Sequence, residues 1–339
     1  MRILVTGAAG FIGGNYVLFR LENYPGDTIV SLDKLTYAGN LENLASVMDD
    51  PRHQFVKGDI ADSNLVEELF DAQDKRFDAV INFAAESHVD RSIDNPDIFL
   101  KTNTFGAFTL LEAVRRHGAG MFIQVSTDEV YGSLGLDDPS FTETTTIDPS
   151  SPYSASKASA DFMALSYYRT YQIPVIVTRC SNNYGSYQFP EKLIPLFINN
   201  LLNDKQVPIY GSGENTRDWI HVRDHCGAIN LILEKGKSGD VYNIGGQCEK
   251  KNIEIADHLI EMMGKDKSMK KFVTDRPGHD FRYSMDISKM ESELGWRPAV
   301  KFEDGLKETV DWYKNNRAWL EKVTSGAYRG YYDKMYKNR

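Results

Sequence analysis

The sequence has few cysteines and no long apolar run. Cys180, Cys226 and Cys248 are the three cysteines among 339 residues, and no Cys-x-x-Cys pair occurs. An odd, scattered set argues against a disulfide framework or a zinc ribbon, and it is typical of a reducing compartment. No stretch approaches the ~18 apolar residues of a membrane span. Because residues 1–7 read as a strand ending at a glycine, and not as a secretory signal, we expect a cytoplasmic protein.

The sequence also lacks an excess of positive charge. Its 39 Lys and Arg residues stand against 48 Asp and Glu residues, so the net charge is −9. An acidic surface repels phosphate backbones, which argues against nucleic acid as the main partner. Apolar residues make up 41% and charged residues 26%, a balance typical of globular proteins. At ~150 residues per domain, the length predicts about two domains.

Short β-branched runs alternate with helical patterns through the first half of the chain. The predicted strands are residues 3–6, 28–32, 54–57, 79–83, 122–126 and 175–178, and the predicted helices are residues 11–23, 63–72, 97–117 and 152–172. This alternation predicts βαβ units, and the nearly continuous apolar strands indicate burial on both faces. We therefore expect an α/β fold, a Rossmann-type doubly wound parallel sheet with a smaller C-terminal substrate-binding domain.

The alternation weakens after about residue 180. We expect residues 1–180 to form the sheet domain, with 217–247 returning to it, because residues 241–244 are apolar. Residues 181–216 and 248–339 then form a smaller domain built to hold a ligand. In the latter part, residues 303–320 read as a helix, and the aromatic tail 328–332 is expected to pack against the domain.

A glycine pattern follows the first strand and opens the first helix. Gly7, Gly10 and Gly13 stand in the sequence TGAAGFIG at residues 6–13. Without Cβ atoms this turn can approach a pyrophosphate, and the helix N-terminus offers unpaired N–H groups to the anion. The pattern predicts a dinucleotide site.

Two acidic residues at strand ends support that site. Asp33 lies twenty positions beyond Gly13, where a carboxylate can accept hydrogen bonds from a ribose. It would repel a 2′-phosphate and so favours NAD over NADP, although the neighbouring Lys34 weakens that preference. Asp59 and Ile60, after the third strand, are placed to hold an adenine edge.

Five residues carry the predicted chemistry. Tyr153 and Lys157 lie four residues apart on one helical face. A nearby ammonium and a cationic nicotinamide are expected to lower the pKa of the phenol, so that it can take a proton from a sugar hydroxyl. Thr127 follows a buried strand, where ligands of open α/β sheets bind. The adjacent Asp128 and Glu129 can divide acid and base work if their surroundings separate their pKa values.

His221, His225 and Cys226 have some metal-ligand character. The two histidines have i, i+4 spacing, but the Glu that zinc hydrolases place after the first His is Val222 here. We therefore expect no metal, and we interpret these side chains as packing and hydrogen-bonding residues.

The glycine turn and the Tyr153/Lys157 pair resemble the extended short-chain dehydrogenase/reductase superfamily. Within it, further segments resemble the nucleotide-sugar 4,6-dehydratases that act on dTDP-glucose. Those segments are residues 33–40, 84–92, 126–132, 181–185, 189–195, 217–219 and 276–280. The Asp128-Glu129 pair is the specific part, because related 4-epimerases lack it. The resemblance extends to about residue 325 and implies NAD as the cofactor. It makes residues 1–180, with 217–247, the NAD-binding domain, and residues 181–216 and 248–339 the nucleotide-sugar-binding domain.

The resemblance also assigns residues to the two ligands. Beside the residues named above, it implies for the cofactor Phe11, Ile12, Leu35, Thr36, Phe83, Ala84, Ala85, Ser87, Thr102 and Asn183. For the nucleotide sugar it implies Ser87, Thr127, Asn182, Lys192, Leu193, Pro208, Ile209, Tyr210, Arg217, Asn252, Asp275, Arg276 and His279. Arg217 and Lys192 suit the diphosphate, residues 208–210 suit the base, and 275–279 form a loop over the nucleotide.

The implied reaction is a dehydration without net redox change. Tyr153 removes the C4 hydroxyl proton while NAD+ takes the C4 hydride, Glu129 removes the C5 proton, and Asp128 protonates the C6 hydroxyl as water leaves. Hydride then returns to C6 and a proton to C5, giving a 4-keto-6-deoxy sugar. The reaction requires a protonated Asp128 and an ionised Glu129, and it implies a place in dTDP-L-rhamnose biosynthesis.

Three alternatives stay open. A 4-epimerase of the same fold needs Tyr153 and Lys157 but not the acid–base pair, so Asp128 and Glu129 argue against it. A dehydratase of CDP- or GDP-sugars would keep the chemistry and change the base pocket. A non-catalytic NAD-binding regulator tends to lose the catalytic Tyr or a glycine. We also expect a homodimer through the helices near 97–117 and 152–172, since the superfamily commonly pairs this way.

Overall fold

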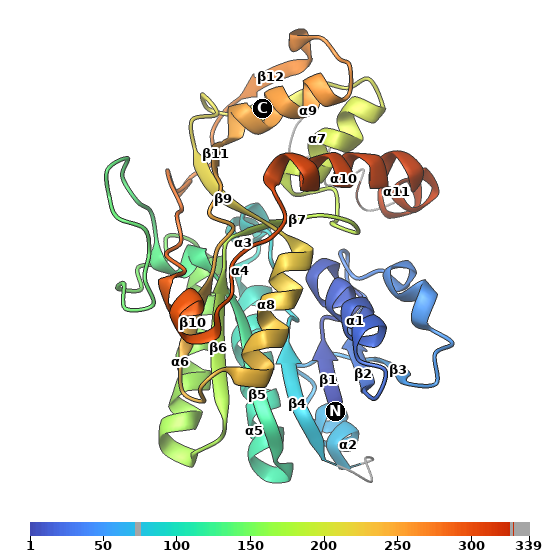
Figure 1. The fold of residues 1–339 in the computed structure, drawn as a ribbon, viewed down its shortest axis with the longest axis vertical. Helices are drawn as coiled ribbons and strands as arrows, with labels where there is room; N and C mark the ends of the chain where they lie inside the picture. The colour runs from blue at the N-terminus through green and yellow to red at the C-terminus, as the bar shows by residue number, and fades with distance from the viewer. Residues whose placement is uncertain (72–75, 326–327, 329–339) are drawn as a thin grey trace.

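A seven-stranded parallel sheet forms the larger part of the molecule. The structure is a computed structural model that describes residues 1–71, 76–325 and 328. The strand order is β10-β6-β5-β4-β1-β2-β3 (Figure 1). The strands are β1 (Arg2–Thr6), β2 (Thr28–Asp33), β3 (His53–Lys57), β4 (Phe77–Asn82), β5 (Ala119–Thr127), β6 (Val175–Cys180) and β10 (Val241–Ile244). Every neighbouring pair is parallel, so the predicted Rossmann-type α/β fold is confirmed.

Helices cover both faces of this sheet. The helices α1 (Phe11–Asn23) and α8 (Val222–Lys235) pack on one face, and α2 (Ser63–Asp71), α5 (Gly106–His117) and α6 (Pro152–Tyr171) pack on the other. Along β1, Ile3 and Val5 join the first core while Leu4 joins the second. Because strand residues point to alternate faces, a strand covered on both sides reads as a continuous apolar run.

A smaller helical part lies beyond the carboxyl ends of the strands (Figure 1). It has a core of its own, built by α7 (Leu193–Leu202), α9 (Asn252–Met262), α10 (Phe302–Asn315) and α11 (Arg317–Val323). Two short sheets belong to it, β8 (Val207–Tyr210) with β12 (Lys270–Val273), and β11 (Glu249–Lys251), β9 (Thr216–His221) and β7 (Asn182–Tyr184). The remaining elements are η1 (Leu41–Val47), α3 (Val89–Asp94), α4 (Pro96–Phe99), η2 (Leu100–Phe105), η3 (Asp128–Tyr131), η4 (Lys267–Met269) and η5 (Met290–Leu294).

Most predicted elements are confirmed within three residues, but two predicted helices are interrupted. The helix expected over 97–117 consists of α4, the π-helical η2 and α5. The helix expected over 303–320 is broken between α10 and α11 at Asn316, whose φ of −117° and ψ of 44° lie outside the helical region. The spacing of apolar residues does not reveal such breaks. One irregular residue or turn leaves the apolar residues of the helices before and after it at helical spacing.

Within the described part of the chain, no helix has the length and apolarity that crossing a bilayer requires. Of the aromatic tail, Tyr328 is buried, and its ring lies 5.7 Å from that of Phe189 between centroids. Its hydroxyl donates to the Pro190 carbonyl at 2.8 Å. Residues 329–332 of the predicted packing segment lie outside the described residues.

The helix α11 is tied to the glycine turn that follows β1. Trp319 Nε1 donates to Asn43 Oδ1 at 2.9 Å, and Asn43 Nδ2 donates to the Ala9 carbonyl at 2.9 Å. The same carbonyl accepts the Asn40 N–H at 2.9 Å. The buried Asn43 amide therefore links α11 of the smaller part to the glycine turn by two hydrogen bonds.

Replacing Trp319 by Phe should therefore destabilise the protein by about 1–3 kcal/mol, because it leaves the buried Asn43 carbonyl oxygen without its donor. Urea unfolding should show a lower midpoint with an unchanged slope. The matched control is Trp312→Phe. It removes the same indole group from a ring whose centroid lies 5.0 Å from that of Trp319, and it leaves the hydrogen bond to Asn43 in place. Equal losses in the two variants would contradict the role given to this hydrogen bond.

Candidate active site

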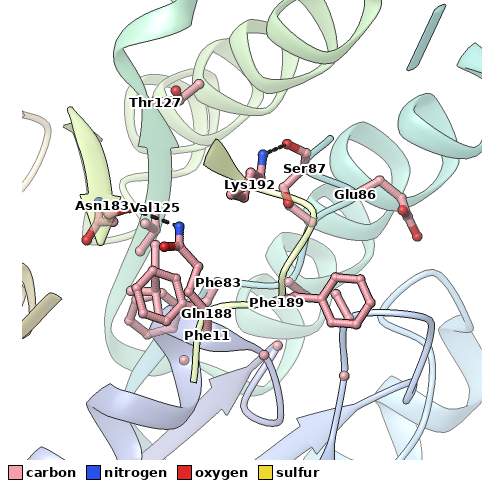
Figure 2. A pocket seen from close by; sticks show the side chains of 18 of the residues that line it. Phe11, Phe83, Glu86, Ser87, Val125, Thr127, Asn183, Gln188, Phe189 and Lys192 are labelled. Carbon is pink, nitrogen blue, oxygen red and sulfur yellow. Dashed lines mark hydrogen bonds between the residues drawn. The ribbon is translucent and has the colours of Figure 1, made fainter. Parts of the chain in front are cut away.

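A cavity of about 320 Å³ lies at the carboxyl ends of β1, β2, β4, β5 and β6 (Figure 2). Most of the predicted cofactor residues line it, namely Gly7, Gly10, Phe11, Ile12, Gly13, Asp33, Lys34, Thr36, Asp59, Ile60, Phe83, Ala84, Ala85, Ser87, Thr102 and Asn183. The five predicted catalytic residues Thr127, Asp128, Glu129, Tyr153 and Lys157 line it as well, together with Asn182, Lys192 and Leu193. Leu35 is not among the lining residues.

The glycine turn has no room for side chains. A Cβ on Gly7, whose φ is +66°, would lie 2.7 Å from the Ala84 nitrogen, and one on Gly13 would lie 2.3 Å from the Gly7 carbonyl oxygen. The N-cap of α1 is Gly10, so no side chain caps the first N–H groups of the helix. This end of the cavity therefore fits the diphosphate of a dinucleotide.

Asp33 and Lys34 are both held by neighbouring groups. The Asp33 carboxylate accepts the Ala9 N–H at 2.9 Å and the Leu35 N–H at 2.7 Å. Burial raises the pKa of Asp33, and these two hydrogen bonds act in the opposite direction. The Lys34 ammonium lies 2.7 Å from a carboxylate oxygen of Asp59. The Lys34 charge is thus paired, and the site favours a ribose hydroxyl over a phosphate next to Asp33.

The helix α6 holds the Tyr153/Lys157 pair on its buried face. A capping box of Ser151 and Ser154 starts the helix, with Pro152 in its first turn. The Lys157 ammonium donates to the Val125 carbonyl at 2.7 Å. Both side chains reach the cavity from this rigid element.

The protein's own groups raise the pKa of Tyr153, so the lowering expected with a bound cationic nicotinamide stays a prediction. Burial raises the pKa of Tyr153 well above its usual value, the nearby Glu129 adds to the rise, and a hydrogen bond with Thr127 lowers it. Burial also lowers the pKa of Lys157. The protein's own groups therefore keep the phenol protonated, and its ionisation requires a further positive charge in the cavity.

Asp128 and Glu129 lie in different surroundings. Asp128 is 2% exposed; its Oδ1 accepts the Thr127 hydroxyl at 3.1 Å, and its Oδ2 has no partner among the described residues. Burial, and next the charge of Glu129, raise the pKa of Asp128 well above its usual value. Burial raises the pKa of Glu129 too, but Arg276, Lys192 and Arg217 act against the rise. The pair is thus arranged to keep a proton on Asp128.

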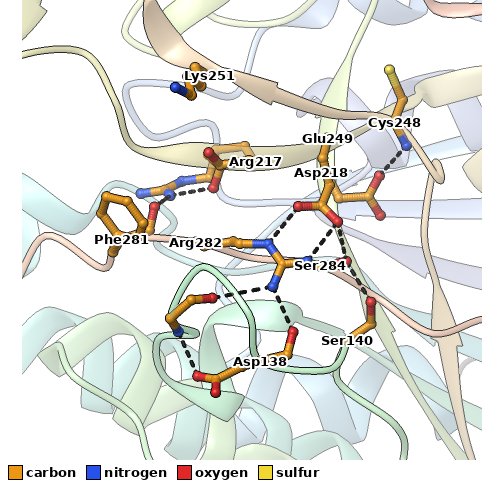
Figure 3. A network of polar contacts seen from close by, with 12 residues as sticks. Asp138, Ser140, Arg217, Asp218, Cys248, Glu249, Lys251, Phe281, Arg282 and Ser284 are labelled. Atoms are coloured by element: carbon orange, nitrogen blue, oxygen red, sulfur yellow. Dashed lines mark hydrogen bonds and ion pairs between the residues drawn. The ribbon is translucent and has the colours of Figure 1, made fainter.

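Eight of the predicted sugar-binding residues do not line the cavity. They are Pro208, Ile209, Tyr210, Arg217, Asn252, Asp275, Arg276 and His279. The guanidinium of Arg217 donates to the Thr216 carbonyl at 2.7 Å and to the Asp280 carbonyl at 2.9 Å. It belongs to a polar network in which Arg282 pairs with Glu249 at 2.6 Å (Figure 3). Arg217 and Arg276 nevertheless act electrostatically on Glu129.

Tyr210 and the loop 275–279 meet beside that network. The Tyr210 hydroxyl donates to Asp90 Oδ2 at 3.0 Å, and Arg276 Nη1 lies 3.6 Å from Asp90 Oδ1. His279 Nδ1 lies 2.6 Å from Asp275 Oδ1. Arg276 of this cluster acts electrostatically on Glu129, so the cluster lies near the predicted acid–base pair, and its residues stay candidates for the nucleotide.

The sequence prediction missed fourteen lining residues. They are Leu32, Ala38, Gly39, Gly58, Glu86, Val125, Ser126, Cys180, Ser181, Gln188, Phe189, Glu191, Ile194 and Trp219. Most adjoin a predicted residue in the chain, and that adjacency is the signal that was available. Glu191 next to Lys192 is the clearest case, and its carboxylate accepts Arg91 Nε at 3.0 Å.

Comparisons with known proteins agree on one family. Residues 4–309 match the sequence profile described as GDP-mannose 4,6 dehydratase. A dTDP-glucose 4,6-dehydratase of Xanthomonas campestris pv. campestris is 51% identical, over 96% of this chain and 97% of its own length. One from Escherichia coli is 48% identical over the full length of both.

Similar solved structures include a dehydratase of the same name and, at lower identity, an epimerase. A dTDP-glucose 4,6-dehydratase from Streptomyces venezuelae, crystallised with NAD, is 50% identical with a TM-score of 0.92, covering 95% of this chain and 100% of that one. A UDP-glucose 4-epimerase from Thermotoga maritima is 32% identical with a TM-score of 0.86, covering 94% and 100%.

Replacing Asp128 by Asn should stabilise the fold increasingly as the pH rises. Because the folded-state pKa of Asp128 lies above its unfolded value, its contribution to stability is present at low pH and is lost as the pH rises toward the folded pKa. Because Asn cannot ionise, the free energy of unfolding of the variant does not fall with pH at this position. Urea unfolding at pH 5.5, 7.0 and 8.5 should show a growing advantage of Asp128→Asn over the wild type.

The matched control is Asp311→Asn. The pKa of Asp311 is lowered by its hydrogen bond with Lys307 on the surface, so this variant should gain nothing as the pH rises. A pH-independent effect of Asp128→Asn would show that Asp128 is not held protonated.

Proposed function

The chain belongs to the dTDP-glucose 4,6-dehydratase family of the extended short-chain dehydrogenases/reductases, and on that premise we propose that it converts dTDP-glucose to dTDP-4-keto-6-deoxy-glucose. It is a hydro-lyase, and NAD is its cofactor. The observation that carries the proposed mechanism is the buried Asp128 beside Glu129, in one cavity with Tyr153. A 4-epimerase does not require this carboxyl pair.

The residues present fit NAD along the whole cavity. Gly7, Gly10 and Gly13 leave room for its diphosphate, and Asp33 accepts hydrogen bonds from the adenosine ribose. Bound NAD would supply the hydride acceptor for C4 and the hydride donor for C6 of the sugar, and its cationic ring would supply the positive charge that Tyr153 needs for ionisation. Lys157 lies at the same end of the cavity, four residues along α6 from Tyr153.

Four side chains carry the proposed proton transfers. Tyr153 accepts the proton of the C4 hydroxyl, and Thr127, hydrogen-bonded to Tyr153, orients that hydroxyl. Glu129, whose ionised form is supported by nearby cationic residues, removes the C5 proton. Asp128, kept protonated by burial, donates to the C6 hydroxyl as water leaves.

We assign the nucleotide half of the substrate to the region where Tyr210 and the loop 275–279 meet, beside Arg217. We propose that Lys192, Arg217 and Arg276 balance the diphosphate, because all three lie close enough to act on Glu129. The names of the relatives that are about 50% identical favour dTDP over the GDP of the matched profile. The proposed product is a precursor for dTDP-L-rhamnose, and the three free cysteines fit the cytoplasm, where such sugars are made.

Purified protein incubated with dTDP-glucose should release a product lighter by one water, without stoichiometric NADH. Replacing Asp128 by Asn and Glu129 by Gln together should lower dehydration at least ~10²-fold, because general acid and base catalysis contribute about 10²–10⁴ each. C4 oxidation should persist and appear as absorbance of bound NADH at 340 nm. GDP-mannose serves as the competing substrate, and normal dehydration by the double variant would overturn the assignment.

We also propose a homodimer formed by the helix layer of α5 and α6. Phe162 on α6 is 56% exposed, and Leu100 and Phe105 of the adjoining η2 are 55% and 48% exposed. Phe162→Glu would place a charge in this apolar surface and should shift the protein from dimer to monomer in light scattering. The control Phe272→Glu, at an equally exposed ring on β12, should leave the mass unchanged. A monomeric wild type would refute the proposal.

A further inference from the structure

His225 lies behind the cavity at the start of α8. The strand β9 runs parallel to β7, which pairs Asn183 with Ile220, and α8 begins directly after β9. The first turn of the helix therefore brings the His225 ring to Asn183, and Nδ1 lies 2.9 Å from Asn183 Oδ1. His225 is fully buried, whereas Asn183 lines the cavity (Figure 2).

The contacts of Asn183 fix which way its amide points. Asn183 Nδ2 donates to the Ser181 carbonyl at 3.0 Å and approaches Cys180 Sγ at 3.5 Å. The reversed amide would place two carbonyl oxygens against each other, so Oδ1 must face His225. The His225 ring then carries its proton on Nδ1 and donates it to Asn183. The main-chain carbonyl of Asn183 is also held, by Gln188 Nε2 at 2.9 Å.

The other ring nitrogen of His225 has no partner. Nε2 is buried and makes no hydrogen bond among the described residues. Burial lowers the pKa of His225 to about 3, so the ring is neutral at neutral pH and has one N–H to offer. A buried polar atom without a partner is costly, and an aliphatic side chain would avoid that cost. The N–H bond to Asn183 is the only hydrogen bond that the imidazole makes within the described part of the chain.

We propose that His225 is a positioning residue that locks the Asn183 amide. Asn183 then turns toward the nicotinamide end of NAD its amide nitrogen, whose second N–H has only the long 3.5 Å contact to Cys180 Sγ, and not its carbonyl oxygen. The inference rests on the proposed function of the cavity as an NAD site. It assigns to His225 a role that acts through Asn183, since the imidazole itself does not line the cavity.

The test compares two substitutions of one residue. His225→Leu keeps an aliphatic volume and removes the donor, whereas the amide nitrogen of His225→Asn takes a place similar to that of Nδ1 and can rescue the contact. We expect the Kd of the apo-protein for NAD to rise about tenfold in His225→Leu and to stay within about threefold of the wild type in His225→Asn. The KM for dTDP-glucose should not change in either variant.

A double-mutant cycle separates positioning from folding. In an Asn183→Ala background, His225→Leu should leave the NAD affinity unchanged, although it still alters the melting temperature. The matched control is His221→Leu, a buried histidine that accepts the Arg223 N–H and makes no hydrogen bond to the Asn183 side chain among the described residues. It should lower the melting temperature without changing the Kd for NAD. Nitrogen NMR of the wild type should show the His225 proton on Nδ1.

Two results would overturn the inference. One is an equal loss of NAD affinity in His225→Leu and His225→Asn at similar melting temperatures, and the other is an undiminished effect of His225→Leu when Asn183 is Ala. A wild type that binds NAD but does not dehydrate dTDP-glucose would refute the proposed reaction alone, because NAD binding would still report on His225.

Discussion

A chain of buried side-chain hydrogen bonds holds the strand ends from which the site is built. Thr6 Oγ1 donates to Asn82 Oδ1 at 2.6 Å, and Asn82 Nδ2 donates to Gln124 Oε1 at 2.8 Å. The three residues are paired in register across β1, β4 and β5. Because helices cover both faces of the sheet, these polar groups find their partners in one another and in nearby backbone: Thr6 Oγ1 also accepts the Ala84 N–H at 3.3 Å, and Gln124 Nε2 donates to the Val125 carbonyl at 3.4 Å. A shift of one strand by a residue would break these hydrogen bonds. The hydrogen bonds therefore fix the register of the three strands and the position at which each strand ends.

The loops that leave these strands serve two opposite electrostatic needs. In the proposed function, the turn after β1 accepts an anion, for which it offers glycines and the N-terminus of α1. The turn after β5 holds a carboxylic acid, Asp128, whose pKa is raised by burial and by the neighbouring Glu129. The net charge of −9 does not predict the local charge at either turn. Near Glu129, for example, Lys192, Arg217 and Arg276 supply positive charge.

The sequence predicts those parts of the site that lie in continuous motifs. The glycine turn, Asp33 and the pair Tyr153/Lys157 each combine a short pattern with a place after a strand, and all of them line the cavity. Gln188 could not be predicted in this way, since it reaches the cavity through the packing of the smaller domain. The high pKa of Tyr153 in the protein alone could not be predicted, because burial is set by the whole fold and not by the spacing to Lys157.

The interruption of the helix at 97–117 shows what such packing achieves. Asn103, within the π-helical turn, accepts the Glu86 N–H at 2.8 Å and donates to the Glu86 carbonyl at 3.0 Å. Its amide also donates to Ser156 Oγ at 2.8 Å, on the helix that holds Tyr153. One residue thus couples the loop after β4 to α6. A regular α-helix would rotate Asn103 away from one of these partners, so the irregular turn is part of how the site is assembled.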